Sequence, residues 1–163
     1  MAGSNVLACL SVTLCVSLSL ANDLARGWGD KVDWVSLEEG LKIAKEENKP
    51  LMVIIHKSWC GACKALKPKF AESVDIQELS KKLVMVNTQD DEEPSDSKFA
   101  QDGQYIPRIF FLNPEGEVLT DVINARGSQK YKYYYPDPKD IADSMRRVLQ
   151  GTTETSDKRG GEL

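Results

Sequence analysis

Apolar and polar positions along the chain predict strands that are separated by helices. The continuous apolar runs at residues 51–55 and 83–86 are typical of strands buried on both faces. Residues 32–34 predict a shorter strand. Residues 108–112 and 117–122 flank an Asn-Pro-Glu-Gly sequence, which predicts a tight turn and therefore an antiparallel hairpin.

Helical periodicity occupies the stretches between these strands. Ser36 and Glu39 fit a capping box at the start of a helix that ends near residue 47. Residues 64–73 form the second predicted helix, which Pro68 is expected to kink.

Two further helices are predicted from their first residues. Asp75 is expected to cap a short helix that ends near residue 82. Asp137 is expected to cap a final helix that has Pro138 in its first position. Residues 131–135, which are rich in tyrosine, are predicted to be extended. This order predicts an α/β fold, with a central mixed β-sheet flanked by helices on both faces.

The 163-residue length suits one domain with flanking segments. Residues 1–21 are interpreted as a signal peptide because they hold an uncharged apolar run and end with small residues. That run is shorter than the roughly 20 residues needed to cross a bilayer, and a retained membrane anchor is the alternative. Residues 22–30 are expected to be a flexible lead-in, 31–150 the folded domain and 151–163 a disordered tail.

Charge and the C-terminus restrict the partners. The net charge of −4 provides no basic field for a phosphate backbone, so nucleic acid is not expected. The acidic run at residues 90–93 is interpreted as a solvated loop, with metal binding as the alternative. The chain ends in Gly-Gly-Glu-Leu, which matches the last two positions of an endoplasmic reticulum retention signal. We therefore expect a lumenal protein that is partly secreted, has a retention receptor as a partner, and has no membrane contact after signal cleavage.

The positions of the cysteines favour a reactive role over a structural disulfide that joins distant segments. Cys9 and Cys15 fall in the predicted signal peptide, which leaves Cys60 and Cys63 in the mature chain. Small secreted domains use disulfides to join distant segments, and a pair three positions apart cannot do so.

The position of this pair favours disulfide exchange. Cys60 precedes a predicted helix whose N-terminus stabilises a thiolate, so we expect a depressed pKa and a nucleophilic role. Lys57 and Lys64 are expected to add positive charge. Cys63 lies one helical turn further along and is expected to resolve mixed disulfides as the second thiol.

Three other interpretations stay open. A structural zinc ion needs four ligands, and the mature chain offers only the two cysteines and His56. The pair could form a local structural disulfide, although a short loop gains little stability from it. His56 could be a packed strand-end residue or a proton-transfer group.

The sequence Trp-Cys-Gly-Ala-Cys-Lys after a buried strand, the later Pro68, and Ile106-Pro107 before another strand together resemble the thioredoxin superfamily. The resemblance implies a thioredoxin fold in which Pro107 is cis and Ile106 offers backbone hydrogen bonds to a client strand. It also implies supporting roles around the cysteines for Trp59, Gly61, Ala62 and Lys64. Many thioredoxins carry a buried acid where this chain has Ile54, so proton transfer at Cys63 would need another group.

Residues 56–70 are similar to those of small endoplasmic reticulum oxidoreductases related to the anterior gradient proteins, and this similarity runs from about residue 27 to 149. It implies a glutathione-linked protein-disulfide oxidoreductase, with client proteins and glutathione as partners and neither a bound cofactor nor a metal. The alternative is a client-holding module of the anterior gradient type, with residues 131–135 as its surface.

Overall fold

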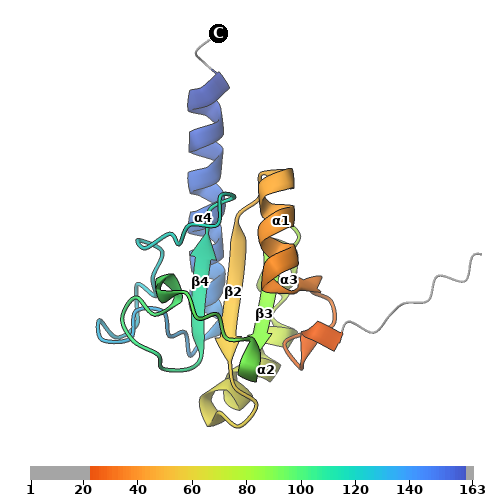
Figure 1. Cartoon of the computed structure of the whole chain (residues 1–163), viewed down its shortest axis with the longest axis vertical. Helices are drawn as coiled ribbons and strands as arrows, with labels where there is room; N and C mark the ends of the chain where they lie inside the picture. The colour runs from red at the N-terminus through yellow and green to blue at the C-terminus, as the bar shows by residue number, and fades with distance from the viewer. Residues whose placement is uncertain (1–22, 161–163) are drawn as a thin grey trace, which may run out of the picture.

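A computed structural model describes the backbone of residues 23–160 and side chains as far as Gly151 (Figure 1). The predicted signal peptide and the final Gly-Glu-Leu lie outside the described residues. At the centre is a four-stranded sheet of order β1-β3-β2-β4. Its strands are β1 (Trp34–Val35), β2 (Leu51–His56), β3 (Val84–Gln89) and β4 (Arg108–Leu112).

The sheet is mixed, as the sequence predicts. β3 pairs in parallel with both β1 and β2, whereas β4 pairs antiparallel with β2. Every residue of β2 is buried, because β2 lies between two strands and is covered on both faces. The first strand begins at Trp34, two residues later than predicted, where Trp34 pairs with Met85.

Helices cover both faces of the sheet, which confirms the predicted architecture (Figure 1). One apolar core lies between the sheet and α2 (Gly61–Glu72), α3 (Val74–Ser80) and α4 (Pro138–Gly160). The other lies beneath α1 (Leu37–Glu47). Over residues 23–160, no helix combines the length and the apolar character needed to cross a membrane.

The α1 helix is fixed at its ends and packs closely on the sheet. Ser36 Oγ accepts a hydrogen bond from the Glu39 N–H at 3.3 Å, and Asn48 ends the helix in the left-handed conformation. Gly40 faces β3 so closely that a Cβ atom there would lie 2.5 Å from Val86 Cγ2. A glycine at this position therefore sets the distance between helix and sheet.

Two helices begin earlier than predicted. The α2 helix begins at Gly61, with Cys60 as its N-cap and Pro68 inside it. The α3 helix is capped by Ser73 rather than Asp75, since the Ile76 N–H donates to Ser73 Oγ at 3.4 Å. Both residue types make good N-caps, so composition does not separate them.

The final helix begins as predicted and ends later than expected. Pro138 is its first residue, and Asp137 Oδ1 accepts a hydrogen bond from the Lys139 N–H at 2.8 Å. The backbone stays helical to Gly160, and in Figure 1 this end of α4 extends beyond the sheet. The predicted disordered tail is therefore wrong for residues 151–160, because one glycine, Gly151, costs only about 1 kcal/mol and no proline follows it.

The predicted flexible lead-in is also wrong. Trp28 is completely buried, and its ring packs against His56 and Phe70 with centroid distances of 5.2 and 5.4 Å. Asn87 Nδ2 donates to the carbonyl oxygens of Leu24 and Ala25, at 2.7 and 3.1 Å. One aromatic side chain and one strand amide thus dock this segment on the fold.

The predicted hairpin is present, but its second arm is not a regular strand. The Asn113 N–H donates to Glu117 O and the Leu119 N–H to Phe111 O, and a single bridge joins Leu112 to Val118. Residues 131–135 contain a bend and a turn at positions 131–133 rather than the predicted extended segment. They fold back because Tyr133 and Tyr135 are buried in the two cores.

Candidate active site

Cys60 and Cys63 form a disulfide at the N-terminus of α2, with their Cα atoms 5.3 Å apart. Cys60 is the N-cap residue, and its Sγ accepts a hydrogen bond from the Cys63 N–H at 3.1 Å. Cys63 is completely buried, whereas 6% of Cys60 is exposed. Cys60 is therefore the cysteine that an external sulfur can approach.

The residues next to Cys60 in the sequence are exposed to solvent. Trp59 is 71% exposed, and Ala62 and Lys64 are exposed as well. A Cβ atom added to Gly61 would have no neighbour within 4 Å. These four residues thus leave the N-terminus of α2 accessible to a large partner.

The loop that contains Pro107 forms the other side of the site. The Ile106–Pro107 peptide bond is cis, which confirms the expectation from the resemblance. Cys60 Sγ lies 3.8 Å from the Ile106 carbonyl oxygen. The fold therefore brings Ile106 and Pro107 to the cysteines across 46 residues of chain.

Lys57 does not supply the free positive charge that was expected. Its Nζ lies 2.6 Å from Glu93 Oε2 and donates to the Asp90 carbonyl oxygen at 2.7 Å. Its charge is consequently paired with a carboxylate, which Arg108 shares.

The acidic run at residues 90–93 borders the site. Asp91 and Glu92 are exposed, as expected for a solvated segment, whereas Asp90 and Glu93 are half-buried. Asp90 Oδ1 accepts a hydrogen bond from the Ser58 N–H at 2.8 Å, which holds the pKa of Asp90 below its ordinary value. Glu92 pairs with Arg26. The carboxylates of Asp90 and Glu92 are therefore held by protein donors, the Ser58 N–H and the Arg26 guanidinium.

Glu93 and Arg108 were missed by the sequence interpretation. Arg108 is 1% exposed, and its Nη2 donates to Glu93 Oε1 at 2.5 Å. Burial raises the pKa of Glu93, but the hydrogen bonds from Lys57 and Arg108 outweigh that effect and leave the pKa low. No sequence signal links two charges 15 residues apart in different elements.

His56 is a packed strand-end residue. Its Nε2 lies 2.7 Å from Asn87 Oδ1, and its ring contacts Trp28. Burial is the main cause that lowers its pKa to about 4, so the imidazole is neutral at pH 7. Ile54 is also fully buried and pairs with Asn87 and Ile109, which leaves an apolar side chain at the position where many thioredoxins have an acid.

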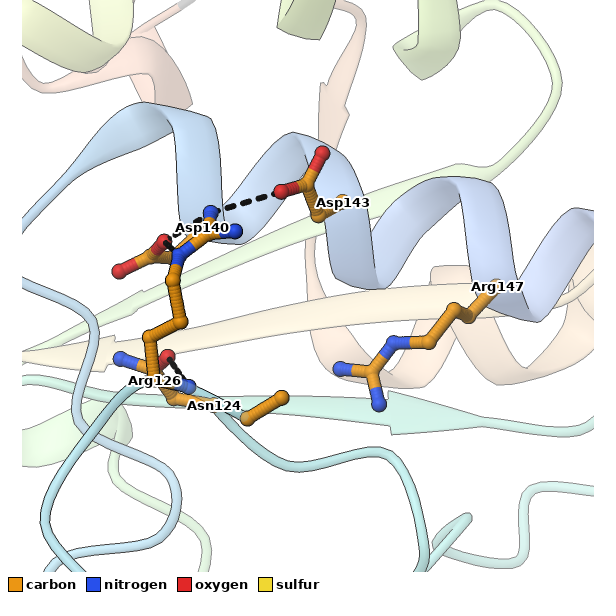
Figure 2. A pocket seen from close by; sticks show the side chains of 6 residues that line it. Asn124, Arg126, Asp140, Asp143 and Arg147 are labelled. Atoms are coloured by element: carbon orange, nitrogen blue, oxygen red, sulfur yellow. Dashed lines mark hydrogen bonds and ion pairs between the residues drawn. The ribbon is translucent and has the colours of Figure 1, made fainter.

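Within the described part of the chain, no group of three or more His, Cys, Asp and Glu side chains is placed to hold a metal ion. A pocket of about 210 Å³ beside α4 contains none of the predicted site residues. Figure 2 shows the side chains that line it. Arg126 there donates from Nε to Asp140 and from Nη2 to Asp143, at 2.6 and 2.7 Å. These ion pairs attach the loop of Arg126 to α4, and Arg147 Nη2 donates to the Ile123 carbonyl oxygen.

Comparison with known proteins agrees with this geometry. The thioredoxin-like family matches residues 33–114. Anterior gradient protein 3 of Mus musculus is 37% identical over 154 residues, covering 88% of this chain and 92% of the relative. Anterior gradient protein 2-B of Xenopus laevis is 38% identical over 141 residues, covering 86% of this chain and 85% of the relative.

A thioredoxin from Thermus thermophilus shares the fold with a TM-score of 0.51 at 15% identity, covering 73% of this chain and 88% of that one. The cysteine pair at a helix N-terminus and the adjacent cis-proline loop thus lie on a fold of the same kind. The chain belongs to the thioredoxin-like family and is a relative of the anterior gradient proteins.

Proposed function

We propose that this protein is a glutathione-linked thiol–disulfide oxidoreductase that reduces or forms disulfides in client proteins of the secretory pathway. One observation carries the proposal. Cys60 occupies the N-cap of α2, and Cys63, three residues later, is close enough to form a disulfide with it. A thiolate at a helix N-terminus is stabilised by free N–H groups and by the helix dipole.

Client reduction proceeds in two exchanges. The Cys60 thiolate attacks one sulfur of the client disulfide, which breaks that bond, forms a mixed disulfide and releases the other client sulfur to take up a proton. Cys63 then loses its proton and attacks Cys60 Sγ. The second client sulfur leaves and is protonated. The client has gained two electrons, and the enzyme holds the Cys60–Cys63 disulfide.

Two glutathione molecules restore the enzyme in the proposed cycle, forming one molecule of glutathione disulfide. The same steps in reverse pass the enzyme disulfide to a client dithiol. The net direction depends on the potential of the cysteine couple relative to the lumenal poise of roughly −180 to −210 mV.

The endoplasmic reticulum lumen is the proposed location, with partial secretion. Support comes from the apolar N-terminal run and the Glu-Leu end. The run of residues 56–70 also resembles that of thioredoxin domain-containing protein 12, a small lumenal oxidoreductase.

A second candidate function is client holding without redox turnover, favoured by the kinship with anterior gradient proteins. Tyr131 is 38% exposed and packs edge-on against Tyr105. Tyr133 and Tyr135 are buried, so half of the tyrosines in the expected surface belong to the core instead. This burial favours the enzyme over the holding module.

The variant Cys60→Ser separates the two functions. The oxidoreductase function predicts that glutathione-driven reduction of insulin is abolished, together with thiol–disulfide exchange with glutathione disulfide. The matched variant Cys63→Ser is expected to accumulate mixed disulfides, because Cys60 remains free to attack. Unchanged turnover in Cys60→Ser would contradict the proposed enzyme, whereas holding predicts that suppression of client aggregation persists in both variants.

A further inference from the structure

Three charged side chains form a continuous network beside the cysteines. The Glu93 carboxylate binds Lys57 through Oε2 at 2.6 Å and Arg108 through Oε1 at 2.5 Å. Lys57 comes shortly before the cysteines, and Arg108 comes directly after Pro107. One carboxylate thus joins the two chain segments that border the active disulfide.

On the proline side, Arg108 is held in place by every part of its guanidinium. Nε donates to Phe99 O at 3.1 Å, and Nη1 donates to Tyr105 O at 2.5 Å. Its side chain is 2% exposed, and a buried charge of this kind is tolerated only when it is paired and hydrogen-bonded. Tyr105 immediately precedes Ile106, so the network ends one residue from the carbonyl group that lies beside Cys60 Sγ.

On the cysteine side, the network reaches the loop that carries Trp59. Lys57 Nζ donates to Asp90 O at 2.7 Å, and Asp90 Oδ1 accepts from the Ser58 N–H at 2.8 Å. Ser58 is two residues before Cys60. The positions of both loops are therefore set by contacts that converge on the segment containing Asp90 and Glu93.

We propose that Glu93 is a positioning residue that fixes the spacing between the cysteine loop and the cis-proline loop and thereby the affinity for polypeptide clients. This inference rests on the proposed function. A polypeptide must contact both loops when its disulfide meets Cys60. A small disulfide needs only the sulfur of Cys60, so its turnover does not depend on the spacing.

The variant Glu93→Gln tests the role with little change of shape. A carboxamide has one oxygen and one NH₂ group, so it can accept from only one of the two cations and places a donor towards the other. The matched control is Glu78→Gln, which removes an exposed ion pair between Glu78 of α3 and Lys81, the residue that follows α3. Turnover is measured with insulin and with hydroxyethyl disulfide, both under glutathione.

For Glu93→Gln we expect KM for insulin to rise about tenfold, with kcat and the turnover of hydroxyethyl disulfide within about twofold of wild type. Glu78→Gln is expected to match wild type with both substrates. Equal losses with both substrates, or no change with either, would overturn the positioning role. If the wild-type protein turns over neither disulfide, the proposed function fails and the positioning role fails with it.

Lys57→Met keeps the test informative even if Glu93→Gln folds poorly, because the buried pair of Glu93 and Arg108 stays intact. It should raise KM for insulin selectively. The double variant Lys57→Met/Glu93→Gln should lose less than the sum of the two single losses, because both substitutions break the same Lys57–Glu93 pair. Additive losses in the double variant, or an unchanged KM in Lys57→Met, would count against the network.

Discussion

The indole of Trp28 meets the ring of Phe70 edge to face, with ring centroids 5.4 Å apart and planes at 85°. This contact joins a residue that precedes the first strand to the helix that Cys60 caps and that contains Cys63. The N-terminal segment is therefore part of the support of the active site, and the stability of the domain depends on it.

Replacing Trp28 tests that dependence. Trp28→Ala removes a fully buried indole and should lower the free energy of unfolding by about 3–5 kcal/mol. The matched change Trp59→Ala removes an indole that is 71% exposed and should alter stability by less than about 0.5 kcal/mol. Urea denaturation followed by far-UV circular dichroism measures both values. Equal effects of the two substitutions would show that the lead-in does not belong to the core.

The reactivity of Cys60 provides a second prediction. In reduced Cys63→Ser protein, the rate of alkylation by iodoacetamide should follow a titration with a midpoint clearly below the ordinary thiol pKa of about 8.5, because Cys60 caps α2. The denatured variant serves as the control and should titrate near the ordinary value. A native midpoint at or above 8.5 would remove the basis for a nucleophilic Cys60.

The buried imidazole gives a pH-dependence that can be isolated, because His56 is the only histidine of the chain. Its pKa is about 4 in the folded protein and about 6.5 when unfolded. As the pH falls below 6.5 the unfolded chain gains a proton that the native chain does not, so stability is lost. From pH 7 to 5 the loss should be about 2 kcal/mol.

His56→Phe should remove this part of the pH-dependence, which makes the difference between the two proteins the quantity to measure by denaturation. Proton NMR of the imidazole gives an independent check in the folded state. A native midpoint near 6.5 would contradict the burial of an uncharged ring.

Gly40 and Gly61 lie in helices and allow the effect of close packing on stability to be compared with the effect of helix propensity. Alanine is favoured over glycine inside a helix by about 1 kcal/mol. At Gly61 nothing lies within 4 Å of the added Cβ, so Gly61→Ala should be neutral or stabilising. At Gly40 the same methyl group would collide with Val86, so Gly40→Ala should destabilise by about 1–3 kcal/mol. Thermal unfolding of both variants checks the difference, and a stabilised Gly40→Ala would show that α1 can move away from the sheet.

The sequence predicts those parts of the fold that have a local or periodic signal. The continuous apolar run at residues 51–55 identifies β2, and Pro138 after Asp137 identifies the start of α4. The resemblance adds the cis bond before Pro107. In each case the information lies in a few adjacent residues.

The remaining features depend on contacts between distant segments. Trp28 is a single aromatic residue in a glycine-rich stretch, so no periodicity marks it as core. Glu93 belongs to an acidic run that is typical of a solvated surface, and only the fold brings Lys57 and Arg108 to it. Glycine-rich and acidic stretches are usually exposed, and at Trp28 and Glu93 contacts with distant segments outweigh that tendency.

The three tryptophan side chains have different surroundings, so intrinsic fluorescence reports on two separate events in this protein. Trp59 is exposed and directly precedes Cys60, whereas Trp28 and Trp34 are buried in the core that the sheet forms with α2. Fluorescence from Trp59 therefore responds to opening and closing of the neighbouring disulfide, and emission from the enclosed pair responds to unfolding. A Trp59→Phe protein would keep the second signal alone, so redox change and loss of structure could be followed separately without an attached dye.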